Sequence, residues 1–243
     1  MTIKNRETIT EKLFRIAAVK RGYKLHKSIV VPEKLTPLTK DLLISRPEGF
    51  TVLELGAGSG EFAAEWVKKH PEHNYIAFEI KGHRIKSLLG EIDRFGLNSI
   101  KIIPVNFKWF LNEILPGHFA DLVIINFPDP WPKKRHWKHR LIDQEFPIKI
   151  SEIVKEGGIV HIATDYGPYA RKVLSVFRNS EMFIPEYDFP HYKRTKPDDF
   201  PSTRFEKIHE NDGKKSYYQQ WRLIHGRKKS DIQKPDQGID PSK

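Results

Sequence analysis

Apolar and polar positions along this chain form blocks with two different periods. Five short apolar runs predict β-strands at residues 51–55, 75–80, 100–105, 121–127 and 159–163. The segments between and after these runs place apolar residues at helical spacing, and they predict helices at 61–70, 83–95, 108–115, 146–155 and 169–177. Because strands alternate with helices, the pattern favours a parallel sheet with right-handed crossovers.

The period changes toward the C-terminal end. Residues 205–209 and 217–224 are alternating runs joined by the sequence N-D-G-K at 211–214, which is a strong hairpin signal. We therefore expect an α/β fold with a mostly parallel sheet, helices on both of its faces and an antiparallel pair at its end.

Composition indicates one main domain and two terminal segments. The first 34 residues carry nine Lys/Arg against three Glu, with Ile9, Leu13 and Ile16 at roughly helical spacing. This segment either docks on the body or touches a nucleic acid as an arm. We expect a basic helical extension at 1–34, the main domain at 35–225 and a disordered charged tail at 226–243.

The charge balance favours a polyanionic partner, because 42 Lys+Arg exceed 31 Asp+Glu and give a formal net charge of +11. No apolar run has the length of a membrane span, and the first residues lack the apolar core of a signal peptide. The chain has no cysteine for disulfides or thiolate metal sites. We expect a cytoplasmic protein without a metal, either a monomer or a homodimer.

Between the first strand and the first helix the chain reads L-E-L-G-A-G-S-G. Gly56, Gly58 and Gly60 permit a tight turn and a close approach of the backbone to a ligand. A dinucleotide fingerprint has a small residue where Glu61 stands here. Glu54 is an unfavourable neighbour for a pyrophosphate, and it suits a ligand that carries an amino cation and a sulfonium.

Two further polar residues follow the next strands. Glu79 ends the second strand, about twenty residues past the glycine turn, where a carboxylate can bind both ribose hydroxyls. Asn106 ends the third strand and either hydrogen-bonds an adenine edge or caps the next helix. With the glycine turn, this arrangement resembles the class I S-adenosylmethionine-dependent methyltransferases over about residues 50–223. The resemblance implies a seven-stranded Rossmann-like sheet that ends in an antiparallel hairpin.

The stretch I-I-N-F-P-D-P-W-P-K-K-R-H-W-K-H-R at 124–140 carries the strongest chemical signal. An apolar run ends in a proline-fixed turn with one carboxylate, Asp129, and a strand end is where an α/β enzyme keeps its chemistry. Residues 131–140 then hold five Lys/Arg, two His and two Trp, with no acid. Cations suit phosphates and rings suit bases, so the stretch indicates an enzyme that acts on a nucleotide in RNA or DNA.

This stretch is similar to the P-D-P-W-x-K-x-R-H motif of the bacterial tRNA (guanine-N7)-methyltransferase family. A-T-D at 163–165 and T-R-F-E at 203–206 match two further motifs of that family. The resemblance implies methyl transfer from S-adenosylmethionine to N7 of a guanine in tRNA, at a variable-loop guanosine. The cofactor site it implies consists of Glu54, Gly56, Gly58, Gly60, Glu79, Asn106 and Asp129. The substrate contacts it implies are Lys133, Asp165, Thr203, Arg204, Phe205 and Glu206. Many members carry Asp in place of Asn106.

The chemistry of the acceptor assigns roles to these residues. Guanine N7 has a lone pair and no proton, so methyl transfer is a direct in-line displacement that needs no general base. It needs alignment and support for the positive charge on the purine, which we expect from Asp129 as the catalytic residue. Asp165 suits the amide and amino edge of guanine. We expect RNA contacts from the basic run, Lys134, Arg135, His136, Lys138 and Arg140.

Several alternatives stay open at the level of sequence. Trp131 and Trp137 either stack on bases or anchor the loop. His136 and His139 are three residues apart, but other metal ligands are lacking nearby. The loop at 126–128 is a poor match to the N-P-P-[FYW] loop of exocyclic-amino methyltransferases, because Phe127 separates the Asn from the Pro. An inactive RNA-binding module is a third reading, and the retained carboxylates argue against it.

Overall fold

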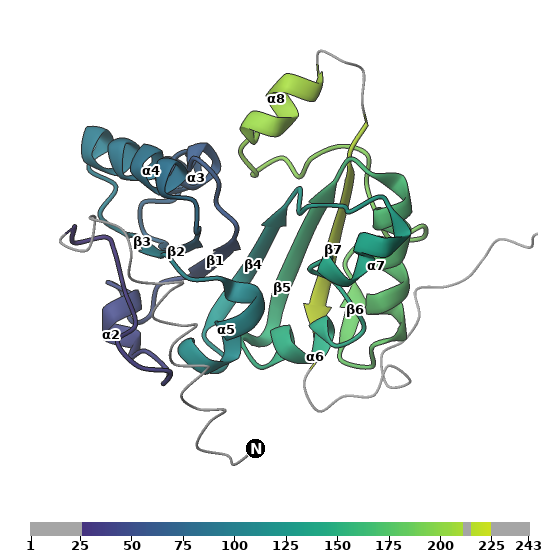
Figure 1. Cartoon of the computed structure of the whole chain (residues 1–243), viewed down its shortest axis with the longest axis horizontal. Coiled ribbons are helices and arrows are strands. Elements are labelled where there is room, and N and C mark those ends of the chain that lie inside the picture. Colours follow the sequence, from purple (N-terminus) through teal and green to yellow (C-terminus); the bar gives the residue numbers. More distant parts are fainter. Residues whose placement is uncertain (1–25, 211–214, 225–243) are drawn as a thin grey trace, which may run out of the picture.

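A single seven-stranded sheet organises the part of the chain that this computed structural model describes, residues 26–210 and 215–224 (Figure 1). The strand order is β3-β2-β1-β4-β5-β7-β6. Five strands are parallel, namely β1 (Thr51–Leu55), β2 (Asn74–Phe78), β3 (Ile100–Ile103), β4 (Ala120–Asn126) and β5 (Val154–Thr164). β7 (Tyr217–Leu223) runs antiparallel to both β5 and β6 (Phe183–Pro185). The predicted α/β class and the five apolar strands are confirmed.

Helices cover both faces of the sheet, each with its own hydrophobic core. On one face α3 (Glu61–Lys69) and α4 (Gly82–Phe95) bury apolar side chains against Val52, Ala77 and Ile102. On the other face lie α5 (Phe107–Ile114), α6 (Phe146–Ser151) and α7 (Gly167–Asn179), which pack on Leu53 and Val123. Short elements complete this region, α2 (Lys40–Leu43) and the 3₁₀ helix η1 (Lys134–His139). No helix among the described residues has both the length and the apolar character needed to cross a bilayer.

The predicted strand at 205–209 is wrong, because these residues belong to the helix α8 (Arg204–Glu210). The Thr203 hydroxyl accepts a hydrogen bond from the Glu206 amide, and the Glu206 carboxylate accepts one from the Thr203 amide. This reciprocal capping box starts a helix and outweighs the alternating pattern. The antiparallel partner of β7 is β6, whose three residues are too few to show a period. The expected hairpin turn at 211–214 lies outside the described residues.

Part of the expected N-terminal extension lies along the edge of the sheet. Ile29 forms a parallel bridge with Ile102 of β3, and the Val30 amide donates to the Ile102 carbonyl at 2.9 Å. Ile29 is buried in the core between the sheet and α4. Residues 28–30 therefore form one isolated parallel bridge on the outer side of β3. The expected helix around Ile9–Ile16 and the expected tail at 226–243 lie outside the described residues.

Candidate active site

The carboxyl ends of β1 to β5 meet at one edge of the sheet and bring the expected polar residues to a common place. Crossovers lead from β1 toward β2 and β3 on one side, and the chain then returns to β4 on the other side of β1. Ligands of open α/β sheets bind at such a switch point. The residues at this edge are Glu54, Glu79, Asn106, Asp129 and Asp165, which end or follow β1, β2, β3, β4 and β5.

The glycine turn lies directly on the end of β2. Gly56, Gly58 and Gly60 all have positive φ, at 93°, 61° and 91°, which side chains other than glycine rarely adopt. The amides of Gly56 and Ala57 donate to the Phe78 carbonyl at 3.0 and 2.9 Å. The expected cofactor turn thus has a fixed conformation, set by the next strand.

We expect Gly60→Ala to lower the free energy of unfolding by about 2 to 3 kcal/mol, by overpacking and by strain at positive φ. A Cβ at Gly60 would lie 2.3 Å from Leu88 Cδ1 and 2.8 Å from Leu88 Cβ in α4. Urea unfolding measures the change. Gly90→Ala is the matched control, because nothing lies within 4 Å of its Cβ position, and it should be neutral or stabilising. Equal effects of the two substitutions would contradict the close packing of the turn on α4.

Glu54 is a buried carboxyl group at the end of β1, only 2% exposed. Burial raises its pKa from 4.5 to about 7, and the hydrogen bond donated by the Tyr75 hydroxyl, at 2.8 Å, counters part of this rise. The Asn126 amide lies beside the carboxyl and also lowers its pKa, although its buried Nδ2 reaches no partner in hydrogen-bond geometry. No basic side chain among the described residues pairs with Glu54. A ligand cation would therefore complete this site.

Glu79 is held in place by backbone amides at the end of β2. Its Oε1 accepts hydrogen bonds from the Ile80 and Lys81 amides at 2.8 Å, and its Oε2 accepts one from the Gly58 amide at 3.0 Å. Arg84 Nη1 lies 3.5 Å from the same Oε2, a long ion pair. Oε2 therefore retains capacity for a hydroxyl donor, and its position is tied to the glycine turn.

Asn106 is the N-cap of α5, so the capping interpretation is confirmed. Its side-chain oxygen accepts a hydrogen bond from the Lys108 amide at 3.1 Å. The capping bond uses one of the two lone pairs of this oxygen, so the oxygen retains capacity to accept a hydrogen bond from an adenine amino group.

The loop after β4 has a strained backbone around Asp129. Phe127 and Trp131 have φ of 49° and 41°, in a region that bulky side chains rarely adopt. Arg140 holds this backbone conformation, because its Nε and Nη2 donate to the Pro130 and Trp131 carbonyls at 2.8 and 3.3 Å. Strained backbone of this kind is common where function requires an unusual side-chain position. Here it presents Asp129 as an exposed carboxylate.

The basic run divides into exposed side chains and one buried one. Lys133, Lys134, Arg135 and Lys138 are exposed, and the partly buried His136 accepts a hydrogen bond from Arg135 Nε at 2.9 Å. Arg140 is 7% exposed, and its guanidinium lies over the rings of Trp137 and Tyr169. Its expected RNA contact conflicts with this burial, because its donors face the loop's own carbonyls.

Two side chains that no sequence motif indicates also shape this edge of the sheet. Lys108 Nζ donates to the Lys138 and Arg140 carbonyls at 3.2 and 2.9 Å, and so attaches η1 to α5. Tyr75 lies within an apolar run and donates to Glu54 from the neighbouring strand. Neither residue belongs to a recognisable motif, so only the fold reveals its role.

The four residues of the T-R-F-E motif point in two directions. Thr203 and Glu206 are buried in the capping box, and the Tyr218 hydroxyl also donates to the Glu206 carboxylate. Arg204 is exposed and lies 3.9 Å from Glu61 at the start of α3. The Phe205 ring contacts the Phe127 ring with centroids 4.7 Å apart. Of the four, Arg204 and Phe205 have side chains that can reach a ligand.

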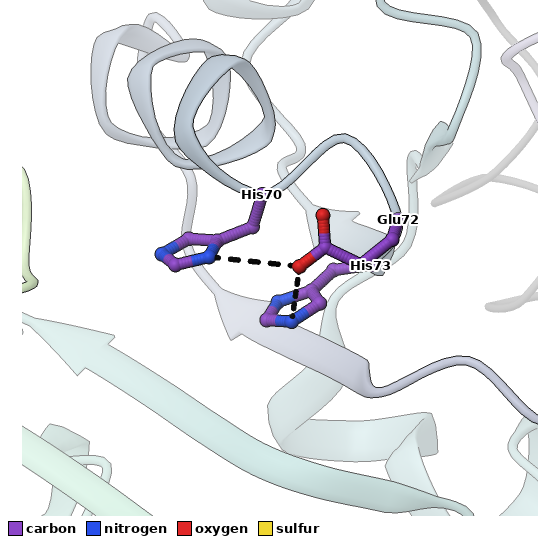
Figure 2. Close-up of side chains that lie close together, drawn as sticks. All are labelled: His70, Glu72 and His73. Carbon is purple, nitrogen blue, oxygen red and sulfur yellow. Dashed lines mark ion pairs between the residues drawn. The ribbon is translucent and has the colours of Figure 1, made fainter.

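Among the residues that the structure describes, one group outside this edge has potential metal ligands, His70, Glu72 and His73 after α3 (Figure 2). Trp66 Nε1 donates to His73 Nδ1 at 3.2 Å, so in neutral His73 the proton lies on Nε2, which is 3.2 Å from Glu72. A metal at Nε2 would need the lone pair that this proton occupies. Burial lowers the pKa of His73, which agrees with a neutral ring. The Trp66–His73 hydrogen bond and the contact of His73 with Glu72 therefore link α3 to the segment before β2.

The fold and the site together define a class. A parallel sheet with a reversed seventh strand, a glycine turn after β1 and carboxylates after β1 and β2 form the architecture of a class I S-adenosylmethionine-dependent methyltransferase. A family model described as "Putative methyltransferase" matches residues 48–219.

Similarity to known proteins gives the particular family. The tRNA (guanine-N(7)-)-methyltransferase of Leptospira interrogans (strain 56601) is 39% identical over 181 residues, which cover 74% of this chain and 82% of that protein. The one of Nitrosomonas europaea is 43% identical over 133 residues, 55% of this chain and 59% of its own. The crystal structure of TrmN from Thermus thermophilus shares the fold, with a TM-score of 0.53 and 17% identity over 74% of this chain and 45% of that chain. The chain belongs to the tRNA (guanine-N(7)-)-methyltransferase family.

Proposed function

We propose that this protein transfers a methyl group from S-adenosylmethionine to N7 of a guanine in tRNA. The observation that carries the proposal is the strained loop after β4. It presents one exposed carboxylate, Asp129, after the strand that pairs with β1 and shortly before the exposed cations of η1 in the chain. The family and the names of its curated members support the same reaction.

The residues at the ends of β1 and β2 suit the cofactor. Glu54 is buried without a cationic partner among the described residues, so the ammonium group of the methionine moiety would supply the missing charge. Glu79 is fixed by three amides and has room at Oε2 for a ribose hydroxyl. Gly56, Gly58 and Gly60 keep the turn free of side chains beside them. S-adenosylmethionine, when bound, supplies the methyl group from its sulfonium.

The acceptor needs alignment more than proton transfer. Guanine N7 carries a lone pair and no proton, so the chain need not provide a general base. Positive charge develops on the purine as the new bond forms, and a carboxylate held close to it stabilises that charge. We assign this role to Asp129, whose position is fixed by the strained loop and by the hydrogen bonds of Arg140 to that loop.

We assign guanine recognition to residues on both sides of Asp129. Asp165 follows β5 and is half-buried, and its carboxylate suits the amide and amino donors of guanine. Phe205 lies on Phe127, where an aromatic ring can cover the face of a base. Lys133 and Arg204 are exposed and supply charge for the nucleotide's phosphate. Thr203 and Glu206 hold α8 in place for this purpose.

Replacing Lys134, Arg135 and Lys138 together with Ala should flatten the dependence of tRNA affinity on salt. Each lost phosphate contact should reduce the slope of log affinity against log salt by about 0.7 to 0.9. Filter binding or fluorescence anisotropy at several salt concentrations measures this slope. Replacing Lys68, Lys69 and Lys86 removes the same charge from α3 and α4 and serves as the control. If the η1 triple variant has the slope of the wild type, η1 does not contact the RNA backbone.

The reaction itself is tested by its product. The protein is incubated with S-adenosylmethionine and unmodified tRNA, and the nucleosides are then identified by mass spectrometry. We expect N7-methylguanosine. A methylated exocyclic amine would replace the proposal with the alternative chemistry, and the absence of any product would favour a binding module. The structure weakens the exocyclic alternative, because Phe127 separates Asn126 from Pro128 and has positive φ.

A further inference from the structure

Arg194 forms a stack of a cation on an aromatic ring outside η1. Its guanidinium carbon lies 3.8 Å from the centroid of the Tyr217 ring. Tyr217 in turn contacts Tyr192 edge to face, with centroids 5.2 Å apart. A guanidinium held flat on a ring has fewer conformations to lose when its edge donates to a ligand. The stack therefore presents a pre-positioned cation.

Backbone pairing places this stack at the active-site edge of the sheet. Lys193 and Tyr218 exchange two backbone hydrogen bonds of 2.9 Å, which fix the residues next to Arg194 beside the start of β7. Tyr217 pairs in register with Thr164, the last residue of β5. Asp165, assigned above to the guanine, is the next residue after Thr164. β7 thus lies between the segment that carries Arg194 and β5, whose end leads to the nucleotide site.

The Arg194 stack and η1 flank the start of α7 from opposite sides. The Tyr217 hydroxyl lies 3.0 Å from the position that a Cβ atom would occupy at Gly167, the first residue of α7. Arg140, which closes η1, lies on the ring of Tyr169. Two residues apart on a helix means a rotation of roughly 200° about its axis. The start of α7, which follows Asp165 in the chain, therefore lies between the two cationic features.

Arg194 is exposed, and no carboxylate among the described residues pairs with it. Ring contact covers one face of the guanidinium and leaves its N–H edges available. Two parallel N–H groups match the oxygens of a phosphate in a bidentate arrangement. We propose that Arg194, supported by Tyr217 and Tyr192, binds a backbone phosphate of the RNA substrate on the side of the target guanosine opposite to η1. This inference rests on the proposed function, since it takes the RNA substrate from it.

The test compares Arg194→Ala, Arg194→Lys and wild type in binding to unmodified tRNA over a range of salt concentrations. We expect Arg194→Ala to weaken binding by about five- to tenfold and to reduce the salt slope by about one phosphate contact. Arg194→Lys keeps the charge but loses the planar fork, so it should retain the slope and recover only part of the affinity. Affinity for S-adenosylmethionine should not change in either variant, which shows that the fold is intact.

The matched control is Arg46→Ala, which removes the same side chain from the opposite edge of the sheet. Arg46 is exposed in the loop before β1, and its hydrogen bonds within the described part of the chain involve its backbone only. A wild-type slope in Arg194→Ala, or an equal loss of slope in Arg46→Ala, would overturn the proposed contact. Failure of the proposed function is a separate result, because it appears as an absent or different methylated nucleoside in the wild-type protein, whereas this test measures binding.

Discussion

Asp129→Ala should lower turnover by about 100-fold or more while the Kd for S-adenosylmethionine changes by only a few-fold, because the carboxylate acts mainly on charge that develops in the transition state. Asp129 is exposed and held in a loop whose strain is fixed by Arg140, so its removal disturbs no buried contact. Single-turnover methylation of tRNA at saturating cofactor measures the chemical step. Isothermal titration of the cofactor measures binding.

Asp129→Asn separates charge from shape. The amide occupies the same space without the negative charge, so it should show nearly the full loss of turnover. Asp41→Asn, an exposed acid in the first turn of α2, is the matched control and should behave as the wild type. Turnover within about threefold of the wild type in Asp129→Ala would remove Asp129 from the mechanism, because one electrostatic group of this kind is worth far more.

Glu54→Gln should weaken S-adenosylmethionine binding by about 10- to 100-fold at pH 7.5, the usual worth of a hydrogen bond to a charged group. The buried carboxyl has a pKa raised to about 7 by desolvation, so its ionised form needs the ligand cation. Wild-type affinity should therefore fall roughly tenfold per pH unit below pH 7, as the carboxyl becomes protonated. In Glu54→Gln this dependence should disappear.

The same substitution should stabilise the protein without cofactor. The pKa of Glu54 is higher in the folded state, about 7, than the ordinary value of 4.5. The folded state therefore holds its proton more tightly, and the free energy of unfolding falls as pH rises from 4.5 through 7. At pH 7.5 Glu54→Gln should raise that free energy by about 2 to 3 kcal/mol, measured by urea unfolding.

Tyr75→Phe provides a graded comparison for Glu54. The Tyr75 hydroxyl donates to the carboxylate and lowers its pKa, so its removal should move the midpoint of the affinity profile to higher pH. Glu48→Gln, at an exposed position, should change neither affinity nor stability. A pH-independent wild-type affinity between pH 6 and 7.5 would show that Glu54 does not bind the cofactor's ammonium group.

The sequence predicted the five parallel strands because each is a buried run that is apolar on both faces. The predicted ends of β1 match the structure, and those of β2, β3 and β4 differ from it by about two residues at most. The agreement is close because apolar burial sets where such runs begin and end. β5 begins earlier than expected, at Val154. Its first part contains K-E-G-G at 155–158, which is not an apolar run, and its register with β4 shifts there. β6 could not be predicted, since it is a strand only through its pairing with β7.

The T-R-F-E motif shows how one pattern supports two structures. Phe205 and Ile208 suit a strand by alternation and a helix by spacing, and the sequence alone does not weigh one against the other. The reciprocal bonds between Thr203 and Glu206 decide for the helix. A Thr followed by a Glu three residues later was a visible signal for this outcome. The family resemblance implies substrate contacts for the same two side chains, although both are buried.

By itself, the sequence determined the class of fold, the glycine turn after β1 and the loop that carries Asp129, because these depend on local features: apolar runs, glycines and prolines beside one carboxylate. The tertiary structure alone decided which charged residues are available to a ligand. Arg140 and Arg194 are the same residue type, yet Arg140 is buried on the loop's own carbonyls and Arg194 is exposed on Tyr217. Burial and partners depend on chain segments distant in sequence, and a single chain's residue pattern does not encode them locally.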